Sequence, residues 1–192
     1  MAANVSPLAA FSADGHAVEW VTSDGRYRES FTLNWENEAW TATGQVGQQN
    51  IQYVLRVSPT WRVRQFLLFR DLDEPDLWLA IDVKGRWGEI NGALRPELGA
   101  SADIELGCTP FSATIPIRRL GLGVGESADI DVVAVDVDTL GAVAVPTRYE
   151  RTGPATWRSV ALPTGAERTF EVDEFGLVIN EVGRFDRREE GS

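Results

Sequence analysis

The sequence predicts an all-β (mainly β) protein with many short antiparallel strands and a single short α-helix. Apolar and polar residues alternate along most of the chain, and turn signals recur about every 8 to 12 residues, as in a sandwich, barrel or rolled sheet. A helical pattern occurs only between Thr109 and Leu120. The chain has 192 residues, 43% of them hydrophobic and 24% charged, which is the size and composition of about one folded domain.

The first predicted hairpin joins residues 17–22 to residues 26–35. Asp24-Gly25 between them is a strong signal for a tight turn. In the second strand four apolar side chains share one face: Tyr27, Phe31, Leu33 and Trp35. This face is therefore expected to lie on the core.

The same alternation predicts the later strands, with turns at Ser58-Pro59 and Lys84-Gly85. These strands are residues 40–46, 51–57, 61–69, 77–83, 86–90, 102–106, 128–137, 142–150, 156–162, 168–173 and 177–180. Residues 121–125 lack the spacing of a dinucleotide-binding loop, and we expect them to form a turn.

The helix is expected between Thr109, as the cap, and Leu120, with Pro110 at its first position. Phe111 and Ile115 would line one side. Pro116 should bend or shorten the helix, because proline cannot donate the backbone hydrogen bond.

We expect three parts along the chain. Residues 1–14 are predicted to be a flexible N-terminal segment, residues 15–186 a single domain, and residues 187–192 a charged tail that frays. No internal repeat or linker divides the middle part.

The charge argues against nucleic acid as a partner. Asp and Glu total 29 against 18 Lys and Arg, which gives a net charge of -11. Apolar runs are too short to cross a membrane, and the N-terminus does not resemble a signal peptide. The protein is therefore expected to be soluble and cytoplasmic, with no transmembrane segment.

Rare residues exclude much catalytic chemistry. The chain has one cysteine, Cys108, one histidine, His16, and one lysine, Lys84. One cysteine excludes a disulfide within the chain and a cluster of thiolate ligands. One histidine argues against a multi-histidine metal site, and no cofactor is expected. We expect Cys108 to be buried and His16 to lie in a surface turn. Carboxylates are plentiful, so catalysis by paired carboxylates stays open.

Seven tryptophans are the most unusual feature of the composition. Each indole buries a large apolar area and keeps one polar N–H group. Core packing is the favoured interpretation for any single tryptophan. The alternative is a wall that contacts sugar or acyl chains, which leads to the hypothesis of a lipid cavity.

Residues 109–120, TPFSATIPIRRL, resemble the signature of a bacterial family named putative glycolipid-binding, formerly of unknown function. Supporting pieces follow the family order: residues 53–56, 61–64, 85–87, 102–106, 148–150 and 172–178. The resemblance covers nearly all of residues 15–188. Ala113 replaces the usual asparagine, which would either orient a ligand or brace the fold, and Gly107-Cys108 replaces short polar residues.

The resemblance implies a spiral β-roll, a many-stranded sheet wrapped around the helix, with a hydrophobic cavity and a homodimeric assembly. It implies a non-enzymatic protein that binds or carries an amphipathic lipid, as the family name suggests a glycolipid. The candidate ligand residues are Trp61, Trp87, Thr109, Phe111, Arg118, Arg119 and Tyr149. Two alternatives stay open: a dimeric assembly module without ligand, and a carboxylate-dependent glycan hydrolase.

Arg118 and Arg119 have two interpretations. In one, a guanidinium at the cavity mouth binds a carboxylate or phosphate head group. In the other, both arginines pair with acidic residues and stabilise the end of the helix.

Overall fold

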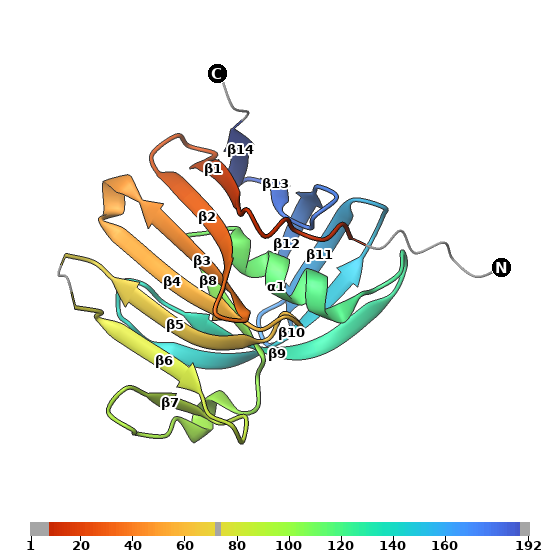
Figure 1. Cartoon of the computed structure of the whole chain (residues 1–192). Coiled ribbons are helices and arrows are strands. Elements are labelled where there is room, and N and C mark those ends of the chain that lie inside the picture. Colours follow the sequence, from red (N-terminus) through yellow and green to blue (C-terminus); the bar gives the residue numbers. More distant parts are fainter. Residues whose placement is uncertain (1–7, 72–73, 189–192) are drawn as a thin grey trace.

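The alternating segments form one long curved sheet around a single helix, in a computed structural model that describes residues 8–71 and 74–188 (Figure 1). The first seven strands are β1 (His16–Thr22), β2 (Arg28–Glu36), β3 (Ala39–Val46), β4 (Ile51–Val57), β5 (Val63–Phe69), β6 (Leu77–Ile81) and β7 (Trp87–Glu89). The others are β8 (Asp103–Leu106), β9 (Ser127–Val135), β10 (Ala142–Arg151), β11 (Thr156–Ala161), β12 (Ala166–Val172), β13 (Val178–Glu181) and β14 (Phe185–Arg188). The helix is α1 (Phe111–Leu120), and two short 3-10 turns are Gly47–Gln49 and Pro96–Leu98.

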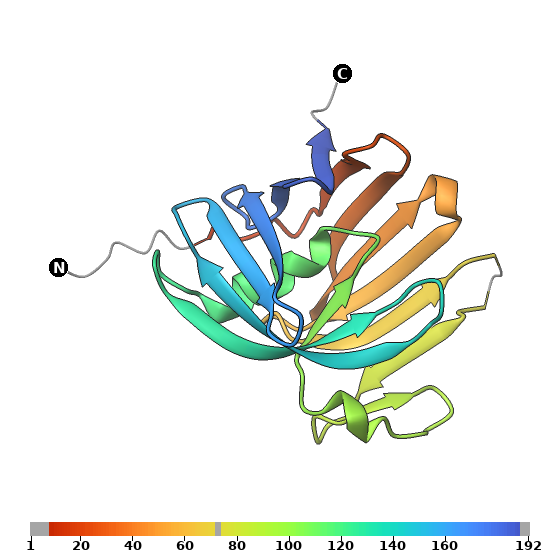
Figure 2. The ribbon, with the colours of Figure 1, turned by 180° about the vertical axis from the view of Figure 1, so that it is seen from behind.

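The sheet has two arms that meet at β1 and β14. Its order is β7-β6-β5-β4-β3-β2-β1-β14-β13-β12-β11-β10-β9-β8, and among the described strands β8 and β9 are the one parallel pair. The arms curl toward each other with α1 between them (Figure 2). Arg70 of the loop after β5 donates to the Asp138 carbonyl after β9 at 3.0 Å, and Val63 N–H donates to the Ala102 carbonyl at 2.9 Å. The all-β roll around one helix is therefore confirmed.

The helix fills the inside of the roll. All residues from Phe111 to Ile117 are buried, because apolar clusters of the sheet surround the helix on more than one side. Phe111 packs on Phe31 with ring centres 4.5 Å apart. Trp20, Trp87 and Trp157 are fully buried, so core packing holds for these three tryptophans.

Three predictions about helix and strand positions differ from the structure. The helix begins at Phe111 rather than at Pro110, and Thr109 Oγ1 accepts a hydrogen bond from the Phe111 N–H at 3.1 Å. Pro116 does not shorten the helix, which continues to Leu120 and ends at Gly121 with a left-handed φ of 60°. The sequence analysis missed β14, because this strand is rich in charged residues and lacks an apolar alternation.

The segment from Leu8 to Asp14, expected to be part of a flexible N-terminus, lies against the roll. Ala9 N–H donates to the Glu174 carbonyl at 2.7 Å, and Phe11 is buried. His16 is not in a surface turn but begins β1, where its ring contacts Phe11. Residues 1–7 and 189–192 lie outside the described residues.

The described part of the chain contains no helix that is long and apolar enough to cross a membrane.

Candidate ligand site

The structure spreads the seven candidate residues over the roll, and several of them contribute to packing. Trp87 donates its indole N–H to the Ser101 carbonyl at 3.0 Å. Tyr149 is buried in the apolar cluster that contains Ala113 and Trp157, and Phe111 lies in the core. These three side chains stabilise the fold from inside.

Arg119 forms a buried ion pair. Its Nε lies 3.1 Å from Asp103 Oδ1 and its Nη2 lies 2.5 Å from Asp103 Oδ2. Burial raises the pKa of Asp103, and the hydrogen bond to the arginine opposes this shift. The pair connects α1 to β8. Arg119 therefore pairs with an acidic residue of the protein, which is the second of the two interpretations given for the arginines.

Arg118 has a different environment. Its guanidinium lies against two neighbouring rings, 4.7 Å from the centre of Phe11 and 4.5 Å from the centre of Trp61. Its Nη1 donates to the carbonyls of Ala9, at 3.1 Å, and of Phe175. Its Nε is buried and has no partner among the described residues.

Among the described residues Arg118 forms no ion pair with a carboxylate. The acid that acts on its charge is Asp173, which already pairs with Arg187 at 2.5 Å and accepts the Phe175 N–H at 2.9 Å. Burial lowers the pKa of Arg118 to about 10. Arg118 is thus a partly buried cation held by rings and neutral carbonyls.

The rings around Arg118 form one cluster, which we call the aromatic site: Phe11, His16, Trp40, Trp61 and Phe175. Trp40 and Trp61 stack with centres 6.2 Å apart. Trp61 has a φ of 59°, which is unfavourable for a bulky residue. Such strain is typical of functional sites, where the surrounding structure holds it in place.

A second polar group lies at the other end of α1. Tyr53 Oη is 2.6 Å from Glu29 Oε1 and 3.0 Å from Thr109 Oγ1, and Glu29 Oε2 has no partner among the described residues. Burial raises the pKa of Glu29 to about 8. Gly44 leaves room for this group, since a Cβ there would lie 2.2 Å from the Tyr53 ring.

The sequence analysis missed Glu29 and Phe11. Glu29 lies between Tyr27 and Phe31 on the buried face of β2, so the alternation itself was a usable signal. Phe11 lies in the segment that was expected to be flexible, and its contacts come from residues far along the chain.

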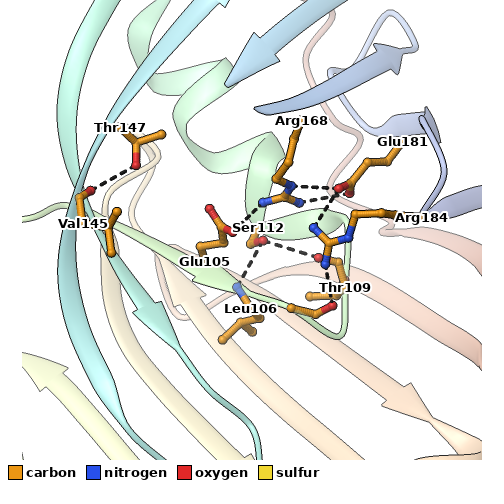
Figure 3. A network of polar contacts seen from close by, with 10 residues as sticks. Glu105, Leu106, Thr109, Ser112, Val145, Thr147, Arg168, Glu181 and Arg184 are labelled. Carbon is orange, nitrogen blue, oxygen red and sulfur yellow. Dashed lines mark hydrogen bonds and ion pairs between the residues drawn. The ribbon is translucent and has the colours of Figure 1, made fainter. Parts of the chain in front are cut away.

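Charged side chains join neighbouring strands near the start of α1 (Figure 3). Arg168 pairs with Glu181 through Nε at 2.8 Å and with Glu105 through Nη1 at 2.8 Å. Arg184 pairs with Glu181 at 2.8 Å and donates to the Gly107 carbonyl at 3.0 Å. The network connects β8, β12 and β13, and the side chain of Glu181 is fully buried.

Two open hollows flank Gly107 and Cys108. One, of about 630 Å³, is lined largely by the tip of the β9–β10 hairpin, including Val135 and Val143. The other, of about 320 Å³, lies beside Tyr27 and Arg184. Cys108 is buried, as expected, and burial raises the pKa of its thiol to about 12.

Ala113, which replaces the asparagine of the signature, is a residue of α1 and is fully buried in the second apolar cluster. Trp157 belongs to the same cluster, and its indole N–H has no partner among the described residues. Ala113 lines neither hollow described above. The position therefore fits a bracing role better than contact with a ligand.

A family model described as "Putative glycolipid-binding" matches residues 17–187. The chain belongs to this family. The structure of this member of the putative glycolipid-binding family is similar to the crystal structure of a DUF1089 family protein from Pseudomonas aeruginosa, with a TM-score of 0.68 and 24% sequence identity. The similarity covers 93% of this chain and 94% of that one, and it shows the fold. No curated protein matches the chain.

Proposed function

We propose that this protein binds an amphipathic lipid without catalysing a reaction, and that the aromatic site holds a sugar-bearing, anionic head group. The observation that carries the proposal is Arg118, a partly buried cation without a carboxylate partner among the described residues. The family description supports a glycolipid.

The overall charge makes the environment of Arg118 unusual. The chain has 29 acidic and 18 basic residues, and the neighbouring Arg119 is paired with Asp103. A phosphate, sulfate or carboxylate of a ligand would form charge-assisted hydrogen bonds with the guanidinium, and these are stronger than bonds to neutral carbonyls. Such a ligand would also give the buried Nε a partner.

The rings of the site suit a sugar and the first part of an acyl chain. Trp40 and Trp61 have large apolar faces with polar N–H groups at their edges, and the Phe11 ring packs on both of them. An apolar face of a sugar ring packs on such a surface while its hydroxyl groups remain solvated.

The hollow of about 630 Å³ does not extend the aromatic site. It lies beside Gly107 and Cys108, before the start of α1, whereas Arg118 lies in the last turn of the helix, and the residues from Phe111 to Ile117 between them are buried. The hydrophobic cavity expected from the resemblance therefore stays a prediction from the sequence.

The hydrolase alternative has weaker support. Glu29 has the raised pKa of a catalytic acid, but its hydrogen-bond partner among the described residues is the hydroxyl group of Tyr53. Most glycan hydrolases use two carboxyl groups that flank the bond to be cleaved. The homodimer, the assembly module and the cytoplasmic location stay predictions from the sequence.

The test compares two detergents that differ in one carboxylate, octyl glucuronide and octyl glucoside, by calorimetry and tryptophan emission. We expect the glucuronide to bind about tenfold tighter or more, as a charge-assisted pair predicts. Arg118→Gln should abolish this difference. Arg64→Gln is the matched control, because Arg64 is exposed on β5.

Equal affinities of the wild-type protein for both detergents, or an unchanged difference in Arg118→Gln, would refute the assignment of the head group. Native mass spectrometry of the protein purified from its own cells should also show a co-purified acyl species with an anionic head group.

A further inference from the structure

We propose that residues Ala9 to Phe11 occupy the ligand subsite of the aromatic site, and that a bound ligand takes the place of the Phe11 ring. This inference rests on the proposed function. It names both the position of the ligand and the part of the chain that competes for it.

Phe11 lies at the centre of the aromatic site. Its ring centre is 5.6 Å from that of Trp61, 5.7 Å from Trp40 and 5.3 Å from Phe175. The residue is only 8% exposed although it precedes the first strand. Of the aromatic residues in the site, Phe11 alone comes from outside the folded roll, since His16 begins β1 and the others follow later in the chain.

The segment fills two places that a ligand would need. The Phe11 ring lies over the Arg118 guanidinium next to the Trp61 ring, whose centre is 5.6 Å away. The Ala9 carbonyl accepts a hydrogen bond from Arg118 Nη1 at 3.1 Å. A ring next to an oxygen acceptor is also what an anionic sugar presents, so the segment has the chemistry of the proposed ligand.

Few backbone bonds hold the segment. In the described part of the chain, the backbone hydrogen bond from residues 8–11 to the roll is Ala9 N–H to the Glu174 carbonyl, at 2.7 Å. The segment crosses the end of the roll beside α1 and reaches β1 without joining the sheet (Figure 1). Its displacement therefore leaves every strand pair intact.

Displacement also selects the ligand. When the segment leaves, Arg118 loses an acceptor and one ring, and its charge remains partly buried. A neutral amphiphile replaces the ring but not the acceptor. An anionic, ring-bearing amphiphile replaces both, so the segment raises the discrimination of the site between the two classes.

The decisive experiment locks the segment in place. Ala9→Cys combined with Glu174→Cys puts two thiols on backbones that are joined by a hydrogen bond, close enough for a disulfide. The natural Cys108 is buried and will not compete. The matched control is Ala9→Ser combined with Glu174→Ser.

We expect the oxidised double-cysteine protein to bind octyl glucuronide at least tenfold more weakly than the same protein after reduction. The serine control should bind as the wild type does, with or without reductant. Equal binding by the oxidised and reduced forms would refute the displacement of the segment but leave the proposed function standing. Binding by none of the forms would refute both.

A second variant separates competition from simple packing. Phe11→Ser removes the competing ring, so we expect octyl glucuronide to bind severalfold more tightly, whereas Ser12→Ala in the same segment should change nothing. If Phe11 were only part of the core, Phe11→Ser would weaken binding together with the melting temperature, and that result would overturn the inference.

Discussion

Replacing Glu29 by glutamine should flatten the dependence of stability on pH. Glu29 is fully buried among Tyr53, Thr109 and apolar side chains, and removal from water raises its pKa from 4.5 to about 8. Glutamine has nearly the same shape and keeps an acceptor for the Tyr53 hydroxyl. It has no proton to lose, so it reports on the charge alone.

The direction follows from the raised pKa. The folded state binds the Glu29 proton more tightly than the unfolded state, so its stabilising effect is complete below pH 4.5 and is lost as the pH rises toward 8. At about 1.4 kcal/mol per pH unit, the shift corresponds to a loss of up to about 5 kcal/mol in the free energy of unfolding. The glutamine variant should not show this loss.

Urea denaturation at several values between pH 5 and pH 8.5 measures the effect. We expect the wild-type free energy of unfolding to fall by several kcal/mol more than that of Glu29→Gln over this range. Glu19→Gln, which removes the same charge from an exposed position on β1, should follow the wild type. Parallel curves for the wild type and Glu29→Gln would mean that Glu29 is not a buried acid with a raised pKa.

Three further substitutions test the packing around α1 by their effect on urea denaturation. Phe111→Asp should prevent folding or cost at least about 3 kcal/mol, because an unpaired carboxylate would enter the core. An unchanged free energy of unfolding would place Phe111 at the surface. Arg119→Ala should cost about 3 to 5 kcal/mol, since it leaves Asp103 buried without its partner, and Asp103→Asn in the same chain should recover part of this loss. Gly44→Ala should cost about 1 to 3 kcal/mol through its clash with Tyr53, and a neutral effect would show that the ring moves freely.

The sequence predicted the strands well because half-buried strands have a local signature. Alternation located all but one of the 14 strands in residues 8–71 and 74–188, including the hairpin around Asp24-Gly25. It missed β14, and it contained nothing about the pairing of β14 with β1 or the parallel pairing of β8 with β9. Those pairings depend on how the sheet curls, which is a property of contacts between distant segments.

The site was predicted less completely. Trp61 and Arg118 were both candidates, and the structure brings them into contact. Their third partner, Phe11, carries no local signal, since a phenylalanine in an irregular segment has no periodic neighbours. Trp87 and Tyr149 were chosen from the resemblance, yet their surroundings are those of core residues.

The two ends of α1 differ in what holds them closed. At the start of the helix, opening the roll would separate the buried Glu181 from Arg168 and Arg184, and an uncompensated buried charge costs several kcal/mol. At the end of the helix, opening breaks ring contacts and bonds from Arg118 to neutral carbonyls, and a ligand can replace each of them. The strained backbone of Trp61 lies at this second end, where its ring stays beside Arg118 even when Phe11 leaves. A ligand is therefore expected to enter where the closing contacts are replaceable, and the charged end serves as the fixed base of the roll.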